Sequence, residues 1–181
     1  MMRMLALVLA ITVALPAAAA DYRVGAGSTL GFLADFQGEK FSGQFKTFEA
    51  TIRYDPADLA SSKFDVEVDL ASVVTGDSDR DDALPGADFF DVARTPKARY
   101  TTTGFRKDGD KVIADGTLTL KGKSKPVSLA VRFHSGSDAT FLDVTTTLKR
   151  LDFDVGAGEY ADTSTIGNEV AVNGHLVLVA K

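Results

Sequence analysis

The chain has 181 residues, of which 45% are hydrophobic and 25% charged, and its formal net charge is −5. This composition excludes a disordered chain and a polytopic membrane protein, and an acidic balance without a basic block excludes nucleic acid as a partner. The chain contains no cysteine, so disulfides, thiolate metal sites and thiol catalysis are excluded as well.

Residues 1–20 have the features of an export signal. Arg3 gives a short positive start, an apolar run extends from Met4 to Leu15, and small residues lead to a predicted cleavage site between Ala20 and Asp21. As a helix the apolar run would span about 18 Å, which is too short to cross the hydrocarbon core of a membrane. We therefore expect a periplasmic protein without a stable membrane anchor, with one mature domain covering residues 21–181.

Apolar residues at every second position predict β-strands in the first half of the mature chain. Leu30–Phe36 alternates in this way, and so does Phe64–Leu70, whose other face is acidic. Within Phe41–Tyr54 the apolar residues change from one parity to the other. This change predicts a bulge or bend near Lys46-Thr47.

The segment from Thr75 to Thr95 interrupts the alternation and predicts a long connection with short helical turns, for which Asp77 or Ser78 is the expected N-cap. Further alternating strands follow, separated by turns such as Asp108-Gly109. They cover Ala98–Phe105, Val112–Leu120, Val127–Phe133, Phe141–Leu148 and Val170–Leu178. About eight strands without helical crossovers predict an all-β fold, an eight-stranded antiparallel up-and-down barrel.

The chain has 12 phenylalanines and no tryptophan. Phenylalanine supplies large apolar walls without a polar group that needs a partner, which suits a barrel lined for a hydrocarbon ligand. The same side chains would also serve as an ordinary core that fills the barrel. Composition alone leaves both interpretations open and favours the filled core.

Five motifs occur in the order and spacing of one protein family. They are Phe45-x-x-Phe48 with Tyr54-Asp55-Pro56-x-Asp58-Leu59; Thr75-Gly76-x-x-x-Arg80-Asp81-x-x-Leu84-x-x-x-Asp88-Phe89-Phe90-Asp91; Pro96-x-x-x-Tyr100; Gly116-x-Leu118-Thr119-Leu120-x-Gly122-Lys123-Ser124-Lys125-Pro126-Val127; and Arg150-x-Asp152-Phe153. On these residues the mature chain resembles the YceI family of exported lipocalin-like proteins. It departs from the family pattern at Gly27-Ser28, which lacks a histidine, at Asp154 in place of glycine, and near Tyr160 in place of tryptophan.

The resemblance implies a lipocalin-like barrel with an apolar tunnel for an isoprenoid, such as a polyprenyl diphosphate, a quinone or another long-chain lipid. Together with the alternation, it predicts a wall of Phe32, Phe36, Phe45, Val68, Leu70, Tyr100, Leu118, Leu129 and Phe133, with Leu84, Phe89 and Phe90 from the long connection near one end. A charged head would stay at the barrel mouth, because an unpaired ion is costly in an apolar medium. Its candidate partners are Arg80, Lys121, Lys123 and Lys125, although the three lysines would also suit a solvated hairpin.

Two other kinds of site are poorly supported by their residues. Asp77-x-Asp79-x-Asp81 imitates part of an EF-hand loop, but Asp82 stands where glycine is needed, and a polar clasp of Arg80 with Asp81 is the favoured alternative. His134, expected at a hairpin, and His175 are the two histidines; both are expected to be exposed, and no Gly-x-Ser-x-Gly elbow accompanies them. We therefore predict a binding protein without catalytic residues, metal or cofactor.

Three functions remain for comparison. The first is a carrier or sequestering protein for an isoprenoid or similar lipid, and the second is a stress or interaction protein whose barrel is filled by its own side chains. The third and least favoured is a hydrolase or metalloenzyme. The polar outward faces leave the oligomeric state open, with a homodimer among the options.

Overall fold

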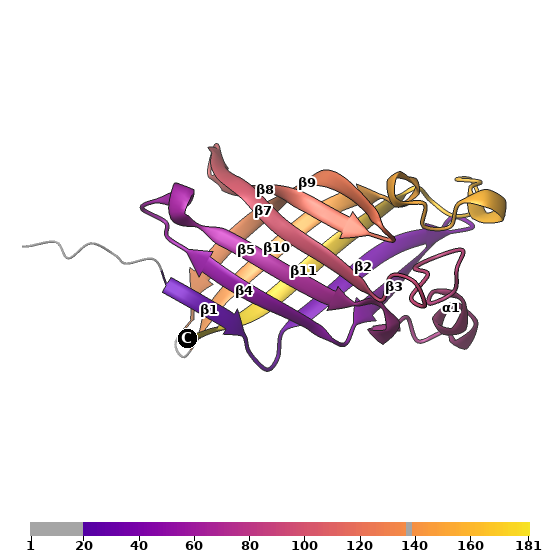
Figure 1. The fold of residues 1–181 in the computed structure, drawn as a ribbon, viewed down its shortest axis with the longest axis horizontal. Coiled ribbons are helices and arrows are strands. Elements are labelled where there is room, and N and C mark those ends of the chain that lie inside the picture. Colours follow the sequence, from indigo (N-terminus) through magenta and orange to yellow (C-terminus); the bar gives the residue numbers. More distant parts are fainter. Residues whose placement is uncertain (1–19, 137–138) are drawn as a thin grey trace, which may run out of the picture.

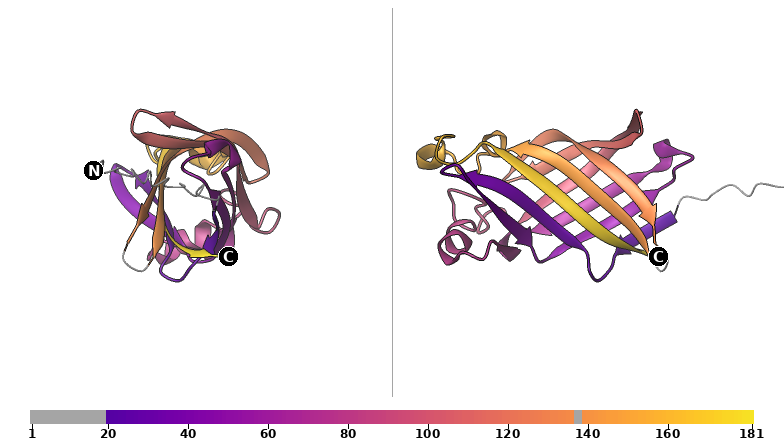
Figure 2. Two further views of the ribbon diagram at one scale, coloured as in Figure 1. Left: turned by 90° about the vertical axis from the view of Figure 1, so that its left-hand side faces the viewer. Right: turned by 180° about the vertical axis from the view of Figure 1, so that it is seen from behind.

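The computed structural model describes residues 20–136 and 139–181, in which one sheet wraps around a common axis (Figure 1, Figure 2). Its strands are β1 (Ala20–Val24), β2 (Thr29–Phe36), β3 (Glu39–Phe45), β4 (Phe48–Tyr54), β5 (Lys63–Asp69), β6 (Val73–Val74), β7 (Lys97–Asp108), β8 (Lys111–Leu120), β9 (Lys123–Ser135), β10 (Thr140–Lys149) and β11 (Glu169–Ala180). The helices are α1 (Ser78–Ala83) and four 3-10 helices, η1 (Leu59–Ser61), η2 (Leu70–Ser72), η3 (Arg150–Phe153) and η4 (Gly158–Tyr160). Apart from Ala20, the predicted export signal lies outside the described residues. Across these two ranges, no helix has the length and apolar character needed to span a membrane.

The sheet closes on itself as a barrel. The strand order is β1-β4-β5-β7-β8-β9-β10-β11-β2-β3-β6, and β1 also pairs with β11. Three wall strands are bent and appear as two segments each, since β1 continues into β2, β3 into β4, and β5 through η2 into β6. The predicted eight-stranded antiparallel barrel is therefore confirmed.

The predicted bend near Lys46-Thr47 is also confirmed, because these two residues separate β3 from β4. Their backbone N–H groups do not take part in regular strand pairing. The Lys46 N–H donates to the Ser72 carbonyl oxygen at 3.1 Å, and the Thr47 N–H donates to Ser72 Oγ at 3.0 Å. The extra residue shifts the parity of the strand, so that Phe45 and Phe48 both pack into the interior.

β5 shows why alternation produces this wall. Phe64 and Val68 are buried in the interior, whereas Asp65 and Glu67 lie on the other face. Arg99 Nη2 donates to Asp65 Oδ2 at 2.6 Å and holds the pKa of the Asp65 carboxyl below its ordinary value. Exposed ion pairs contribute little to stability, so burial of the apolar face is the main stabilising term.

Two glycines let aromatic rings lie flat against the inner wall. A Cβ at Gly43 would lie 2.2 Å from Phe32 Cζ, and one at Gly116 would lie 2.5 Å from Tyr100 Cζ. Tyr100 is buried, and its hydroxyl donates to the Ala114 carbonyl oxygen at 2.8 Å. Burial raises the pKa of Tyr100, so the phenol stays protonated and acts as a donor.

The two ends of the barrel are built differently. The hairpin end carries the turns β4–β5, β7–β8 and β9–β10. The loop end carries the turns β2–β3 and β8–β9, the connection of residues 75–96 with α1, and residues 150–168 with η3 and η4 (Figure 1). The expected helical turn and N-cap are confirmed, since Asp77 Oδ1 accepts a hydrogen bond from the Arg80 N–H at 3.0 Å.

A buried arginine holds the loop end together. Arg150 is the first residue of η3 and is 5% exposed. Its five side-chain N–H groups all donate, at 2.6–3.1 Å, to the main-chain carbonyl oxygens of Val155, Gly156, Tyr160, Ile166 and Gly167. Burial lowers the pKa of Arg150, but a guanidinium remains charged in proteins. One side chain thus joins five carbonyl groups of residues 155–167.

We expect Gly116→Ala to lower the free energy of unfolding by about 1–3 kcal/mol, because the added carbon overlaps the Tyr100 ring and the Thr101 carbonyl oxygen. Gly104→Ala is the matched control, since Gly104 also lies in a strand and has no atom within 4 Å of the added carbon. Urea titration measures the free energy of unfolding of both variants. Equal unfolding free energies for the two variants would contradict this account of the Tyr100 packing.

Arg150→Lys should lower the free energy of unfolding by about 2–4 kcal/mol, because an ammonium group has too few donors to satisfy five carbonyl oxygens. Arg132→Lys, at an exposed position of β9, serves as the control. Amide hydrogen exchange should show residues 155–167 losing protection in the first variant. Unchanged protection there would mean that other contacts hold the loop.

Candidate functional site

The inner face of the barrel carries two clusters of buried apolar side chains. The loop-end cluster consists of Phe32, Ala34, Val68, Leu70, Val73, Phe90, Ala98, Phe153 and Val155. The hairpin-end cluster consists of Ala50, Ile52, Phe64, Ala114, Val131, Leu142, Leu176 and Leu178. Together they make the interior apolar along its length.

Between the two clusters, inward-facing side chains keep part of their surface accessible. Phe48 and Val66 pack against both clusters, yet each is only partly buried. Leu118 on the loop-end side, and Leu129 and Val144 on the hairpin-end side, are also partly buried. A close-packed core would cover such side chains completely. This middle level therefore keeps apolar surface accessible, as do other partly buried side chains packed against each cluster.

A group of aromatic rings that we call the aromatic plug lies at the hairpin end and consists of Tyr54, Phe64, Phe105 and Phe133. Tyr54 and Phe133 stack with ring centroids 3.6 Å apart, and Phe64 lies 4.9 Å from Phe105. Burial raises the pKa of Tyr54, with a smaller contribution from Asp55. Phe133, a predicted wall residue, thus belongs to an aromatic group at the hairpin end.

The long connection contributes apolar side chains to the opposite end. Phe90 is buried, with its ring centroid 5.8 Å from that of Phe45, which in turn lies 5.8 Å from that of Phe32. Leu84 and Phe89 pack against the same loop-end cluster. The three predicted residues of the connection are therefore brought together at one end of the barrel.

The remaining predicted wall residues are mostly interior. Phe32, Val68 and Leu70 belong to the loop-end cluster, Phe45 and Leu118 pack against it, Leu129 packs against the hairpin-end cluster, and Tyr100 is buried. Phe36 corrects the expectation, because it lies at the β2–β3 hairpin, is 38% exposed and forms a backbone bridge with Ile166. Alternation continues past the rim of the barrel, so parity alone does not place this residue inside.

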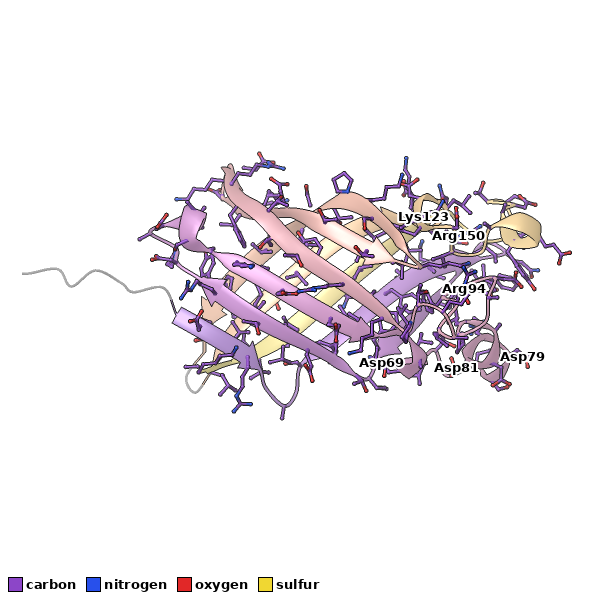
Figure 3. All side chains as sticks on the ribbon, in the orientation of Figure 1. Asp69, Asp79, Asp81, Arg94, Lys123 and Arg150 are labelled. Carbon is purple, nitrogen blue, oxygen red and sulfur yellow. The ribbon has the colours of Figure 1, made fainter. Side chains whose placement is uncertain are left out.

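Three of the four predicted head-group cations bind the protein itself, among them Lys123 at the loop end (Figure 3). Lys121 Nζ donates to the carbonyl oxygens of Asp88 and Asp154, both at 2.9 Å, and Lys123 Nζ pairs with the Asp154 carboxylate at 2.6 Å. Lys125 is exposed near the start of β9. A hollow of about 310 Å³ beside these groups is lined by Asp91, Arg94, Thr95, Lys121, Gly122 and Asp154. The first two lysines therefore join the β8–β9 turn to both loop segments.

Arg80 and its acidic neighbours are also engaged. Arg80 lies over the Phe41 ring, 4.7 Å from its centroid, and pairs with Asp77 at 3.4 Å. Asp81 accepts hydrogen bonds from the N–H and the hydroxyl of Thr75 at 2.6 and 2.7 Å, and these bonds lower the pKa of Asp81. The expected clasp of Arg80 with Asp81 is wrong in its partners, since Arg80 pairs with Asp77 and Thr75 binds Asp81.

The two histidines meet on the outer face of β9–β11. His175 Nδ1 lies 2.6 Å from Asp143 Oδ1, and His134 Nδ1 lies 3.6 Å from Asp143 Oδ2. His175 is exposed as expected, but His134 is partly buried and stacks on Phe141, because β9 extends to Ser135 beyond the expected hairpin. Within residues 20–136 and 139–181, no group of three or more His, Cys, Asp or Glu side chains is arranged as a metal site.

The role of Arg150 is the main feature that the sequence did not reveal. The motif Arg150-x-Asp152-Phe153 marks a turn after an alternating strand, which was the available signal. Its carbonyl partners come from residues 155–167, a segment without apolar periodicity, so their convergence on one side chain depends on the folded loop.

Several solved structures share this architecture. The chain superimposes on Burkholderia cenocepacia BcnA with a TM-score of 0.81 and 32% identity, covering 85% of this chain and 98% of that one. For the Campylobacter jejuni YCEI protein the TM-score is 0.68 and the identity 29%, with 77% and 84% covered. A polyisoprenoid binding domain from Saccharophagus degradans shares the fold, with a TM-score of 0.66 and 19% identity over 91% of this chain and 100% of that one.

Sequence relatives agree with the structural ones. The chain is 36% identical to Protein YceI of Escherichia coli O157:H7 and 33% identical to Protein YceI of Salmonella arizonae, each over 126 residues or 67% of this chain. The match spans 66% of the length of these relatives. The YceI-like domain as a family matches residues 22–178. The chain therefore belongs to the YceI-like domain family.

Proposed function

We propose that the protein is an exported binding protein that holds a long-chain lipid of isoprenoid or quinone type inside its barrel. The observation that carries this proposal is the band of inward-facing, partly buried apolar side chains between the two clusters, Phe48, Val66, Leu118, Leu129 and Val144. A hydrocarbon chain at this level would cover apolar surface that the protein leaves accessible.

The energetics of such binding are favourable. A buried methylene contributes about 0.8 kcal/mol, so three enclosed five-carbon units contribute on the order of 10 kcal/mol before the costs of association. This is enough for micromolar binding. A charged head would stay in water, because its desolvation would cost more than those units return.

The aromatic plug gives the ligand a direction. With the hairpin end filled by Tyr54, Phe64, Phe105 and Phe133, the end of the hydrocarbon chain would lie toward these rings. The polar head would then be at an opening elsewhere in the wall or at the loop end. Binding of this kind needs no reacting group, so we infer a binding protein rather than an enzyme.

Family membership and the leader support the biological setting. Residues 1–20 favour export to the periplasm, where an envelope lipid would be encountered. The polyisoprenoid binding domain of Saccharophagus degradans suggests the ligand class by its name, but at 19% identity it is a likeness of fold. The ligand class proposed for this chain therefore depends on the chemistry of its interior.

The proposal is tested by organic extraction of gently purified protein with mass spectrometry, and by titration with geranylgeraniol, an uncharged C20 isoprenoid alcohol. We expect a bound lipid in the extract and saturable binding of the alcohol. A clean extract together with no binding of the alcohol would favour the alternative of a barrel filled by its own side chains.

A pair of neighbouring substitutions separates lining from core. Val144→Trp places a large ring in the interior, opposite Gly174, and should weaken geranylgeraniol binding at least about tenfold, with the melting temperature near that of the wild type. Thr145→Trp, on the exposed outer face of the same strand, should leave binding unchanged. If the interior is solid, Val144→Trp should instead destabilise the fold by about 1–3 kcal/mol.

A further inference from the structure

The wall of the barrel is interrupted between two neighbouring bent strands, one formed by β1 and β2 and the other by β3 and β4. Pairing of β1 with β4 ends at Arg23↔Thr51, and pairing of β2 with β3 begins at Leu30↔Phe45. The residues between, 24–29 on one side and 46–50 on the other, have no ladder between them. Backbone groups on the two sides of this gap form hydrogen bonds with other strands instead. The Gly25 N–H donates to the Val177 carbonyl oxygen at 2.7 Å, and the Lys46 N–H donates to the Ser72 carbonyl oxygen at 3.1 Å.

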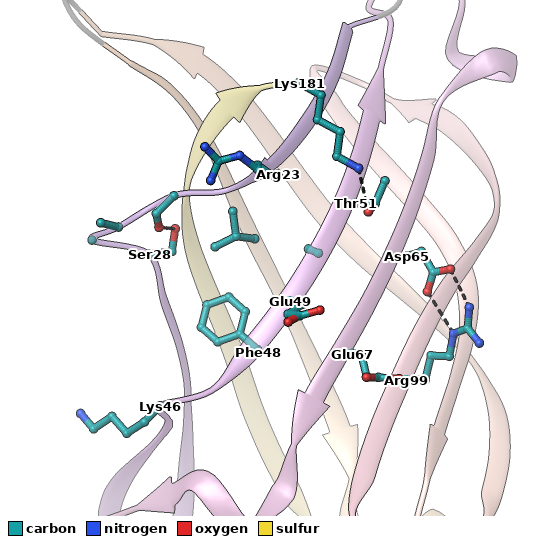
Figure 4. A pocket seen from close by; sticks show the side chains of 15 residues that line it. Arg23, Ser28, Lys46, Phe48, Glu49, Thr51, Asp65, Glu67, Arg99 and Lys181 are labelled. Atoms are coloured by element: carbon teal, nitrogen blue, oxygen red, sulfur yellow. Dashed lines mark hydrogen bonds and ion pairs between the residues drawn. The ribbon is translucent and has the colours of Figure 1, made fainter.

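A hollow of about 750 Å³ lies at this interruption (Figure 4). It is lined by Arg23, Val24, Gly25, Ala26, Gly27, Ser28, Lys46, Phe48, Glu49, Ala50, Thr51, Asp65, Glu67, Arg99 and Lys181. We call it the side opening. Figure 4 shows the Phe48 ring projecting from β4 toward the turn that precedes β2.

Three of the residues that line the side opening also contribute to the barrel interior. Ala50 belongs to the hairpin-end cluster, Val24 packs against it, and Phe48 packs against both clusters. Phe48 is also one of the partly buried side chains proposed to hold the lipid, so the side opening reaches the level at which the lipid would lie. Phe48 is the aromatic side chain that lines the side opening, and a partly exposed side chain can change rotamer within nanoseconds.

The rim of the side opening carries an excess of positive charge. Arg23, Lys46 and Lys181 have no carboxylate within 4 Å among the residues that the structure describes; Lys46 donates to Gln44 Oε1 and Lys181 to Thr51 Oγ1. The lining carboxylates Asp65 and Glu67 pair with Arg99 and Lys97, whereas Glu49 has no ion pair within 4 Å among the described residues.

We propose that the side opening is the passage for the lipid and the binding site of its head, and that this head is a phosphate or diphosphate. The hydrocarbon chain of the lipid would pass Phe48 into the interior, while Arg23, Lys46 and Lys181 bind the anionic oxygens of its head outside. Arginine and lysine are the usual partners of phosphate oxygens. This inference rests on the proposed function and replaces the loop-end lysines Lys121 and Lys123 as head-group partners.

The test compares geranylgeranyl diphosphate with geranylgeraniol at 150 mM salt. In the double variant Arg23→Gln/Lys46→Gln, the ratio of diphosphate to alcohol affinity should fall about tenfold. Lys107→Gln/Lys111→Gln, in the exposed β7–β8 hairpin, removes the same charge and should leave the ratio unchanged. Raising the salt to 0.5 M should weaken diphosphate binding to the wild type but not alcohol binding.

Three outcomes decide between the two proposals. An unchanged ratio in Arg23→Gln/Lys46→Gln would overturn the side opening, and so would a loss found instead in Arg94→Gln/Lys125→Gln at the loop end. In both cases alcohol binding by the wild type would keep the proposed function intact. If the wild type binds neither compound, the proposed function fails and the side opening fails with it.

The passage is tested separately through the rate of release. Phe48→Ala should release geranylgeraniol faster than the wild type does, because the ring over the interior is removed. Phe41→Ala is the control, since Phe41 packs against the loop-end cluster but does not line the side opening. Faster release from Phe41→Ala alone would place the passage at the loop end and contradict the proposal.

Discussion

Closure of the sheet is the constraint on which the rest of the structure depends. It is completed by β1, which pairs with β4 on one side and with the last residues of β11 on the other, through Tyr22↔Ala180, Arg23↔Val179 and Val24↔Leu178. Closure gives every strand two neighbours and creates an interior shielded from water without requiring that side chains fill it. An apolar interior of this kind follows from topology, and its shape follows from where the ladder is interrupted.

The fold could be predicted because its signals are local. Alternation in Phe64–Leu70 indicates a strand with one buried face, and the parity change at Lys46-Thr47 indicates a bend, because strand geometry has a fixed period of two. The turn between β1 and β2, at Gly25–Ser28, is the other side of the interruption in the wall, and no change of parity marks it in the sequence. It becomes visible only when β11 is in place to accept the Gly25 N–H, which is a contact between residues far apart in the chain.

The candidate site could be predicted less completely, because it also depends on contacts between residues far apart in the chain. Parity placed Phe32 and Leu129 on the inner face correctly, but it could not show that the barrel ends before Phe36. Lysine side chains near a turn resemble free cations in sequence, whereas Lys121 is bound by carbonyl oxygens of two segments more than thirty residues away. Whether a lysine is free to bind a ligand depends on its contacts with residues distant in the chain, and the sequence around the lysine does not show those contacts.

The interactions of Arg150 bear on where such a protein can work. Carbonyl oxygens do not titrate over the range in which proteins stay folded, and a guanidinium keeps its proton throughout that range. Unlike the carboxylate contacts of Asp154 and Asp162 in the same loop, these bonds should persist when the surroundings turn acidic. Because the bonds are buried, dissolved ions would screen them only weakly. Wherever acidity and ionic strength follow the medium, the Arg150 bonds would therefore be tolerant of both.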